Sequence, residues 1–143
     1  MKLREIMTSQ VVRIGAEESV AVAARTLAHY NIGALPVCDG RGMVCGFVTD
    51  RDLVTRCVAA GKNPTLTTVR QVMTKNVVSA ASDMDAELAA QLMGREQIRR
   101  LPIVENGRLC GMVSLGDLAS RTKETATAGN TLSKISKNLS MRD

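Results

Sequence analysis

Apolar residues along this chain recur first at helical spacing and then in short strand-like runs. Five apolar residues within positions 19–31 fall on one helical face: Val20, Ala23, Ala24, Leu27 and Ala28. The runs ALPVC (34–38) and MVCGFV (43–48) flank the turn residues DGRG, and this arrangement predicts a β-hairpin. A further helix is predicted for DRDLVTRCVAA (50–60), ending at Gly61.

The same order of elements is written again further along the chain. The segment LREIMTSQVV (3–12) aligns with VRQVMTKNVV (69–78) at an offset of 66, as LPV (35–37) does with LPI (101–103). After a gap of one residue in the hairpin turn, GFVTDRDL aligns with GMVSLGDL at an offset of 65. A match over about fifty residues indicates an internal duplication.

The second copy predicts the same elements as the first. Ser82, with Asp85 three residues later, is expected to be the N-cap of a helix. The runs LPIV and LCGMV around ENGR predict a second hairpin, and LGDLASRTKET predicts the final helix. Together with a short extended segment near Val11, Val12 and Ile14, each copy is a strand–helix–strand–strand–helix unit.

These units predict an α/β (α+β) fold made of two tandem βαββα repeats. About fifty residues bury too little apolar surface to be stable alone, so we expect the repeats to pack by their sheets about a pseudo-two-fold axis. We place repeat 1 at residues 1–62, repeat 2 at 63–122 and a polar tail at 123–143. The tail has apolar residues at helical spacing (Leu132, Ile135, Leu139), and both a short amphipathic helix and disorder remain open for it.

Composition excludes several classes of protein. The 143 residues contain no apolar run of about 20, the length that spans a bilayer, and no signal peptide is recognisable, so we expect a cytoplasmic protein without a membrane segment. The net charge of +5 is modest and the only aromatic residues are Tyr30 and Phe47, which argues against nucleic acid as a partner.

Candidate chemistry for catalysis or metal binding is equally sparse. The four cysteines form no C-x-x-C pair and His29 is the only histidine, so no metal site is predicted. No nucleophile with a neighbouring base is recognisable, which predicts a protein that is not an enzyme. A redox role for Cys38 or Cys57 remains a minor alternative.

The motifs T-x-x-D (Thr49, Asp52) and S-x-x-D (Ser114, Asp117) stand where each hairpin meets its last helix. Each fits a helix capping box, which is a structural role. Each also suits a nucleotide, because a helix start favours phosphate and a carboxylate can accept from both hydroxyls of a ribose. The glycine three residues before each motif would let another group approach the strand closely.

The order of these motifs resembles the cystathionine-β-synthase (CBS) domain: MT before a Val-Val pair, LPV in the hairpin and G-h-h-[ST]-x-x-D before the last helix. Residues 1 to 120 resemble a CBS pair, and VTDRDLVTRCVAAGKNP is similar to bacterial stand-alone CBS-pair proteins. The resemblance implies a non-catalytic sensor that binds adenosine-containing ligands in clefts between the repeats. It also implies a homodimer, a flat disc of four repeats, whose geometry would regulate a partner protein that the sequence does not identify.

The resemblance further implies which residues contact the nucleotide. Thr49 and Asp52 would bind phosphate and ribose in one cleft, and Ser114 and Asp117 would do so in the other. The residues expected to line the base slots are Val11, Val12, Val77, Val78, Phe47 and Met112. The positions before each Leu-Pro, which are expected to approach the ligand, are Gly33, Ala34, Arg99 and Arg100.

The two copies differ in charge before Leu-Pro. Arg99 and Arg100 are adjacent in a predicted strand, so they point to opposite faces and only one is expected to enter a cleft; two solvated surface charges are the alternative. An arginine in the cleft would favour AMP, ADP or ATP over S-adenosylmethionine, a sulfonium cation without phosphate. NAD is also less expected as the ligand. No cofactor is required. The competing hypothesis is a structural dimerisation module whose two motifs only cap helices.

Overall fold

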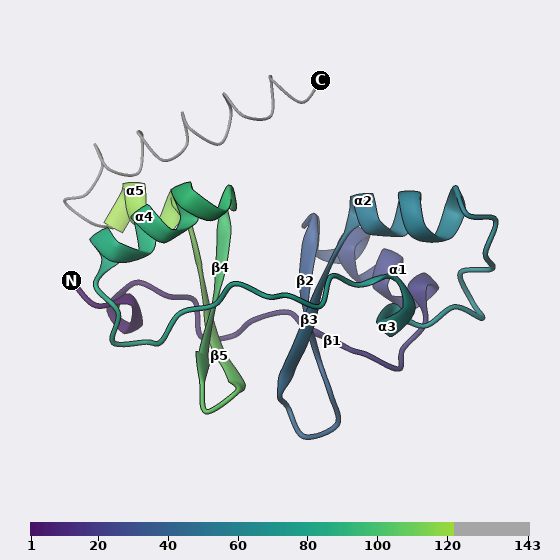
Figure 1. Ribbon diagram of the computed structural model, residues 1–143, viewed down its shortest axis with the longest axis horizontal. Helices are drawn as coiled ribbons and strands as arrows, with labels where there is room; N and C mark the ends of the chain where they lie inside the picture. Colours follow the sequence, from purple (N-terminus) through teal and green to yellow (C-terminus); the bar gives the residue numbers. More distant parts are fainter. Residues whose placement is uncertain (122–143) are drawn as a thin grey trace. The chain divides into compact units, whose positions relative to one another are not determined.

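The computed structural model describes residues 1–121, so the predicted tail at 123–143 lies outside the described residues. The chain divides into two compact units. We call Val12–Val77 the inner unit, and Met1–Val11 together with the described residues from Val78 onward the split unit. Each unit contains one hairpin and the helices that cover it (Figure 1).

The two units exchange the first segment of each sequence copy. Residues 3–11 of the first copy pack with the hairpin and helices of the second copy, and residues 69–77 pack with those of the first copy. The chain therefore passes from one unit to the other at Val11–Val12 and again at Val77–Val78. The predicted repeat limits describe the duplication along the sequence, whereas the units in space begin and end at the two Val-Val pairs.

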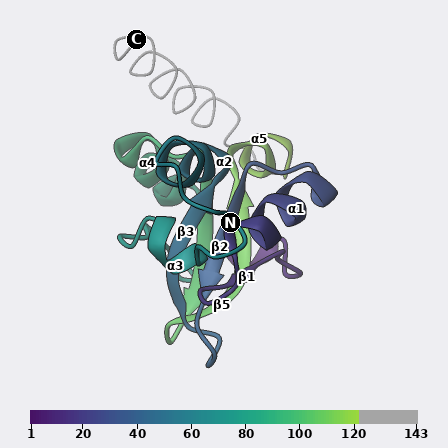
Figure 2. The same cartoon turned by 90° about the vertical axis from the view of Figure 1, so that its right-hand side faces the viewer.

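The inner unit is built on a three-stranded sheet in the order β1 (Ile14–Gly15), β2 (Ala34–Cys38) and β3 (Val44–Thr49). Strands β1 and β2 are parallel, and β2 and β3 form the predicted antiparallel hairpin. The free edge of β3 is extended by an antiparallel bridge between Phe47 and Thr74. Figure 2 turns this unit toward the viewer.

The helices of the inner unit begin and end near the expected residues. Helix α1 (Val20–Tyr30) is capped by Ser19, whose Oγ accepts from the Val22 amide, and it ends at Asn31 in the left-handed conformation. Helix α2 (Asp50–Leu53) widens into one π-helical turn, η2 (Val54–Val58), and the segment ends at Gly61 with φ of 72°. The short helix α3 (Val69–Val72), which the periodicity did not predict, follows the linker.

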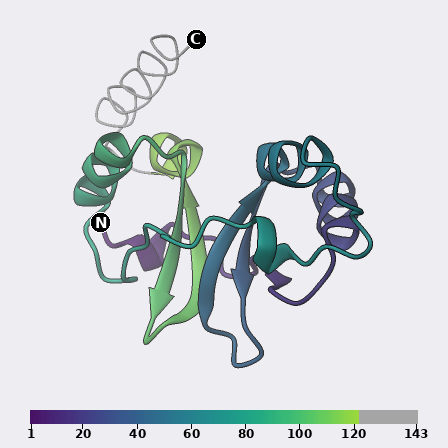
Figure 3. The same ribbon diagram turned by 45° about the vertical axis from the view of Figure 1, so that its right-hand side comes forward.

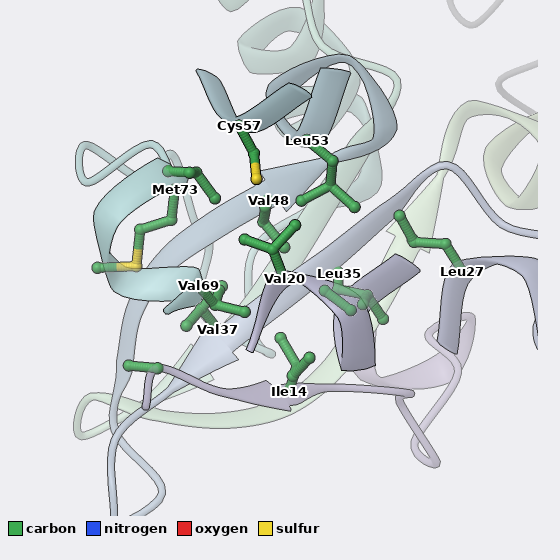
Figure 4. Close-up of a cluster of buried hydrophobic side chains, with 13 residues drawn as sticks. Ile14, Val20, Leu27, Leu35, Val37, Val48, Leu53, Cys57, Val69 and Met73 are labelled. Carbon is green, nitrogen blue, oxygen red and sulfur yellow. The ribbon is translucent and has the colours of Figure 1, made fainter. Parts of the chain in front are cut away.

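The core of the inner unit lies on one face of its sheet (Figure 4). Buried strand residues Leu35, Val37 and Val48 meet side chains from all three helices. The contributing helix residues are Val20, Ala23 and Leu27 from α1, Leu53 and Cys57 from α2 and η2, and Val69, Val72 and Met73 at α3. Burial of these apolar side chains is the main stabilising contribution to the unit.

The split unit repeats this plan with η1 (Leu3–Glu5), α4 (Ala86–Glu96), β4 (Arg100–Glu105), β5 (Arg108–Ser114) and α5 (Leu115–Arg121). Strands β4 and β5 are antiparallel, and their tight turn has positive φ at Asn106 and Gly107. Bridges from Ala80 to Ile103 and from Thr8 to Met112 extend the two edges of this hairpin. Figure 3 shows α5 continuing from β5, with α4 beside it.

The predicted start of the helix in the second copy is wrong. Helix α4 is capped by Asp85, which accepts from the Glu87 amide, and not by Ser82. The Ser82 hydroxyl instead donates to Glu105 at 2.7 Å, and the Ser82 carbonyl accepts from the Arg4 amide at 2.8 Å. Ser82 is held in a turn by its bonds to Glu105 and to the N-terminal segment, so the helix begins three residues later than predicted. The predicted α/β class and the tandem repeat are both confirmed.

Candidate functional site

Both candidate motifs form capping boxes where a hairpin meets its last helix. In the inner unit the Thr49 amide donates to Asp52 Oδ2 at 3.0 Å, and the Asp52 amide donates to Thr49 Oγ1 at 3.1 Å. In the split unit the corresponding distances between Ser114 and Asp117 are 2.9 and 3.0 Å. We call these two places the inner junction and the split junction. Each box fixes the aspartate side chain in one orientation.

In each capping box one carboxylate oxygen of the aspartate accepts a hydrogen bond, and the other carboxylate oxygen takes no part in the box. Asp52 Oδ1 has no hydrogen-bond donor among the described residues; the closest cation is Arg56, whose Nε lies 3.9 Å away. The Asp52 side chain is 13% exposed, so its carboxylate can reach solvent or a ligand. In the described part of the chain Asp117 likewise accepts only through Oδ2. A carboxylate oxygen held in this way can accept hydrogen bonds from hydroxyl groups.

The amides at the start of α2 are not free, which differs from the expectation of a helix end open to phosphate. The Asp50 amide donates to the Gly33 carbonyl at 3.0 Å, and the Arg51 amide donates to Asp50 Oδ1 at 2.8 Å. The Asp52 amide is taken by Thr49. Any phosphate recognised at the inner junction would therefore depend on side chains.

The two motif glycines allow another segment of this chain to approach the strand closely. A Cβ added at Gly46 would clash with the Met73 thioether and lie 2.9 Å from the Thr74 carbonyl oxygen. A Cβ added at Gly111 would clash with Met7 and lie 3.2 Å from the Thr8 carbonyl oxygen. The expected close approach is therefore made by the Met-Thr segment of the other sequence copy. The M-T segment of one copy packs against the glycine of G-h-h-[ST] in the other copy, and this contact is the steric reason why the repeat contains both signatures.

The register of each hairpin places the candidate ligand contacts on one face of the sheet. In the inner unit Ala34 is paired with Thr49, and Pro36 with Phe47. Side chains alternate along a strand, and the intervening Leu35 and Val48 are in the core. Ala34, Phe47 and Thr49 therefore lie on the face opposite the core.

The same register in the split unit separates the two arginines. Arg100 is paired with Ser114 and Pro102 with Met112, while Leu101 and Ile103 are in the core. Arg100 thus lies on the same sheet face as Ser114 and Met112. The residue that precedes β4, Arg99, accepts a hydrogen bond from the Leu115 amide through its carbonyl oxygen at 3.1 Å. Of the two arginines, Arg100 is the one that shares a face with the motif hydroxyl.

The four valines predicted to line base slots lie where the chain passes between units. Val12 is half-buried against the core of the inner unit, and Val78 is half-buried against that of the split unit. Val11 and Val77, the residues just before each passage, are half-buried as well. Packing therefore accounts for Val12 and Val78 in part, and their contact with a base remains a prediction.

Sequence reasoning missed Asp50 and Arg56 as neighbours of the motif. A Cβ added at Gly33 would lie 3.5 Å from Asp50 Oδ2, so this carboxylate stands beside a predicted ligand contact. The guanidinium of Arg56 donates to the carbonyls of Val72 and Met73 at 3.1 and 3.2 Å. The alignment of the copies held a signal for Asp50, because its counterpart is the apolar Leu115.

Other chemistry is limited in the described part of the chain. All four cysteines are free thiols, and burial raises the pKa of Cys38, Cys45 and Cys110. A raised pKa keeps these thiols protonated and poorly reactive. Within residues 1–121 no group of three or more His, Cys, Asp or Glu side chains is placed to hold a metal ion, and no helix has the length and apolar character needed to cross a membrane.

Comparison with known proteins supports the duplication. The sequence model of the CBS domain matches residues 3–59 and 69–124, so it matches both copies. The CBS domain-containing protein YhcV of Bacillus subtilis is 40% identical over 134 residues, which covers 94% of each chain.

Solved structures agree with the fold. Hypoxic Response Protein I, crystallised with two coordinated zinc ions, superimposes with a TM-score of 0.78 at 30% identity, covering 85% of this chain and 98% of that one. The hexameric CBS-CP12 protein from bloom-forming cyanobacteria gives a TM-score of 0.72 at 28% identity, covering 87% and 70% of the two chains. The zinc ions and the hexamer are properties of those proteins.

Proposed function

We propose, from the premise that this chain belongs to the CBS domain family and carries two such domains in tandem, that it is a non-catalytic sensor of adenine nucleotides. AMP, ADP or ATP would bind at the junctions through Asp52 and Asp117. Binding would change the conformation or dimer geometry of the chain and so regulate a partner protein.

The observation that carries this proposal is the recurrence of one carboxylate geometry at both junctions. Asp52 and Asp117 each use Oδ2 for the cap, and in the described residues each keeps Oδ1 without a hydrogen-bond donor. The diol of a ribose offers two donors that suit such an oxygen. The hydroxyls of Thr49 and Ser114 accept from an amide and retain their own proton, which can be donated to a phosphate oxygen.

The expected affinity is that of a sensor. Association costs about 4–15 kcal/mol in lost freedom before any net binding is seen. One ribose contact, one or two charged contacts and an apolar surface for the base would leave a dissociation constant on the order of 1–100 μM. A site of this strength would fill and empty as nucleotide concentrations change.

The formed capping boxes also favour the second candidate, a structural module in which these residues only cap helices. A cap of this kind contributes about 1 kcal/mol to stability whether or not a ligand exists. The two functions differ in what the aspartates do for nucleotide binding.

Three substitutions separate the two functions. Asp52→Ala and Asp117→Ala remove a cap and a ribose acceptor together, whereas Asp85→Ala removes only the cap of α4. If the sensor proposal is right, calorimetry will show nucleotide affinity reduced about tenfold or more by a junction substitution and unchanged by Asp85→Ala. If AMP, ADP and ATP never raise the melting temperature of the unaltered chain, the structural function holds instead.

We further propose that a second copy of this chain covers the outer face of η2. Cys57 is buried on the inner face of this segment, as is Leu53 at the end of α2, while Val54 and Val58 on the outer face are 57% and 65% exposed. A helical segment that is apolar on both faces is usually buried on both faces in the assembled protein. Light scattering should show a dimer that Val58→Lys converts to a monomer; a dimer that persists in Val54→Lys and Val58→Lys would exclude this face.

A further inference from the structure

The two junctions carry charges of opposite sign, each at a position where the other junction has an uncharged residue. At the inner junction the residues before Leu-Pro are Gly33 and Ala34, and the first helical residue is Asp50. At the split junction the equivalent residues are Arg99, Arg100 and Leu115. At these positions the first copy carries the carboxylate of Asp50 and the second copy carries two guanidinium groups, while the exposed Arg51 corresponds to Gly116.

The Asp50 carboxylate lies beside the start of β2. The Asp50 amide donates to the Gly33 carbonyl at 3.0 Å, and a Cβ added at Gly33 would be 3.5 Å from Asp50 Oδ2. The nearby cation Arg56 is directed to the carbonyls of Val72 and Met73. A ligand held by Asp52 that reached toward Gly33 would therefore meet a second carboxylate.

The split junction lacks this second carboxylate and has an arginine beside the motif. Leu115 is 7% exposed and belongs to the core of its unit, so no carboxylate takes the place of Asp50. Arg100 is paired with Ser114 across the hairpin and lies on the same sheet face. A phosphate that accepted from the Ser114 hydroxyl would lie near this guanidinium, which binds phosphate oxygens in a bidentate manner.

We propose that the two junctions select different ligands: the split junction takes a nucleoside phosphate, and Asp50 excludes phosphate from the inner junction, which takes a phosphate-free adenosine group. This inference rests on the proposed function and narrows it, because AMP, ADP or ATP would bind at the split junction alone. One chain then binds one nucleoside phosphate. Asp50 and Arg100 are the residues that determine this specificity.

Calorimetric titration of the full chain with ADP measures both the number of sites and their affinity. We expect one ADP per chain, with an affinity that Arg100→Gln lowers about tenfold, the equivalent of about 1.4 kcal/mol. Asp50→Asn should add a second ADP site, because the amide oxygen can still accept from the Arg51 amide while the repulsive charge is gone. Adenosine should bind the inner junction, and Asp52→Asn should weaken this binding while Arg100→Gln leaves it unchanged.

Asp83→Asn is the matched control, because Asp83 is exposed and has no hydrogen bond or ion pair in the described structure. It removes the same charge and should leave one ADP site. Two equivalent ADP sites in the unaltered chain, or a single site lost in Asp52→Asn and kept in Asp117→Asn, would overturn the assignment of ligands while the sensor function stands. Failure of ADP and adenosine to bind the unaltered chain would overturn the sensor function and this inference together.

Discussion

Replacement of Gly46 by alanine tests the close crossing of β3 and the Met73–Thr74 segment. The added Cβ would lie 2.9 Å from the Thr74 carbonyl oxygen and 3.0 Å from Met73 Cγ. Non-bonded carbon atoms prefer separations of about 3.5–4.0 Å. The Thr74 carbonyl cannot retreat alone, because it accepts from the Phe47 amide at 2.9 Å while the Thr74 amide donates to the Phe47 carbonyl at 2.8 Å.

The expected loss follows from these distances. An overpacked core site costs about 1–3 kcal/mol, and we expect about 2–3 kcal/mol for Gly46→Ala because one clashing atom is backbone. Gly111→Ala should cost less, about 1–2 kcal/mol, since the Thr8 carbonyl oxygen is farther away, at 3.2 Å. Gly40→Ala is the control, because a Cβ there has nothing within 4 Å. Its stability should be unchanged or slightly raised.

Urea unfolding followed by far-UV circular dichroism measures these differences, because the chain has no tryptophan and a single tyrosine. A double-mutant cycle with Met73→Ala measures how much of the stability loss is caused by the Met73 side chain. Shortening Met73 should recover about 1 kcal/mol or more of the loss in Gly46→Ala and leave the part caused by the Thr74 carbonyl. If Gly46→Ala proves as stable as Gly40→Ala, the steric explanation of the paired signatures is refuted.

Three further predictions concern single side chains. Hydrogen bonds from the Ser82 amide and hydroxyl lower the pKa of Glu105, so its stabilising contribution is present above the ordinary value of 4.5 and is lost as pH falls through the lower folded-state pKa. The melting temperature of Glu105→Gln should accordingly lie below that of the unaltered chain at pH 7 and converge with it in acid. Arg56→Gln should cost about 1 kcal/mol in urea unfolding, because a half-exposed cation loses its bonds to the carbonyls of Val72 and Met73 at the end of α3. Arg56→Lys should recover part of this loss. Asp85→Ala should cost about 1 kcal/mol through loss of the α4 cap.

Much of the fold could be predicted from local pattern. The hairpins were readable because DGRG and ENGR separate apolar runs, and Asn31 and Gly61 mark helix ends through their left-handed backbone. The start of α4 was not readable, because Ser82 and Asp85 are both good caps. What decides between them is the pairing of Ser82 with Arg4, a contact between residues far apart in the sequence.

The candidate site was predictable in its residue types and less so in its surroundings. The hydroxyl and carboxylate of each motif lie together as the spacing indicated. The partner of each motif glycine could not be found locally, because Met73 and Met7 belong to the other sequence copy. The adjacency of Asp50 and Gly33 likewise depends on a hydrogen bond between the start of α2 and the start of β2.

The exchange of first segments has a consequence for how the polypeptide acquires its structure. The inner unit is one stretch of 66 consecutive residues, Val12–Val77, whereas the split unit must join Met1 to Ala86, whose amide donates to the Met1 carbonyl. Closing so long a loop costs entropy that a contiguous unit does not meet. During synthesis on a ribosome, the inner unit can thus fold before the segments that pack against the first eleven residues have been made. A fragment that ends at residue 62 would contain those eleven residues but lack the part of the split unit against which they pack.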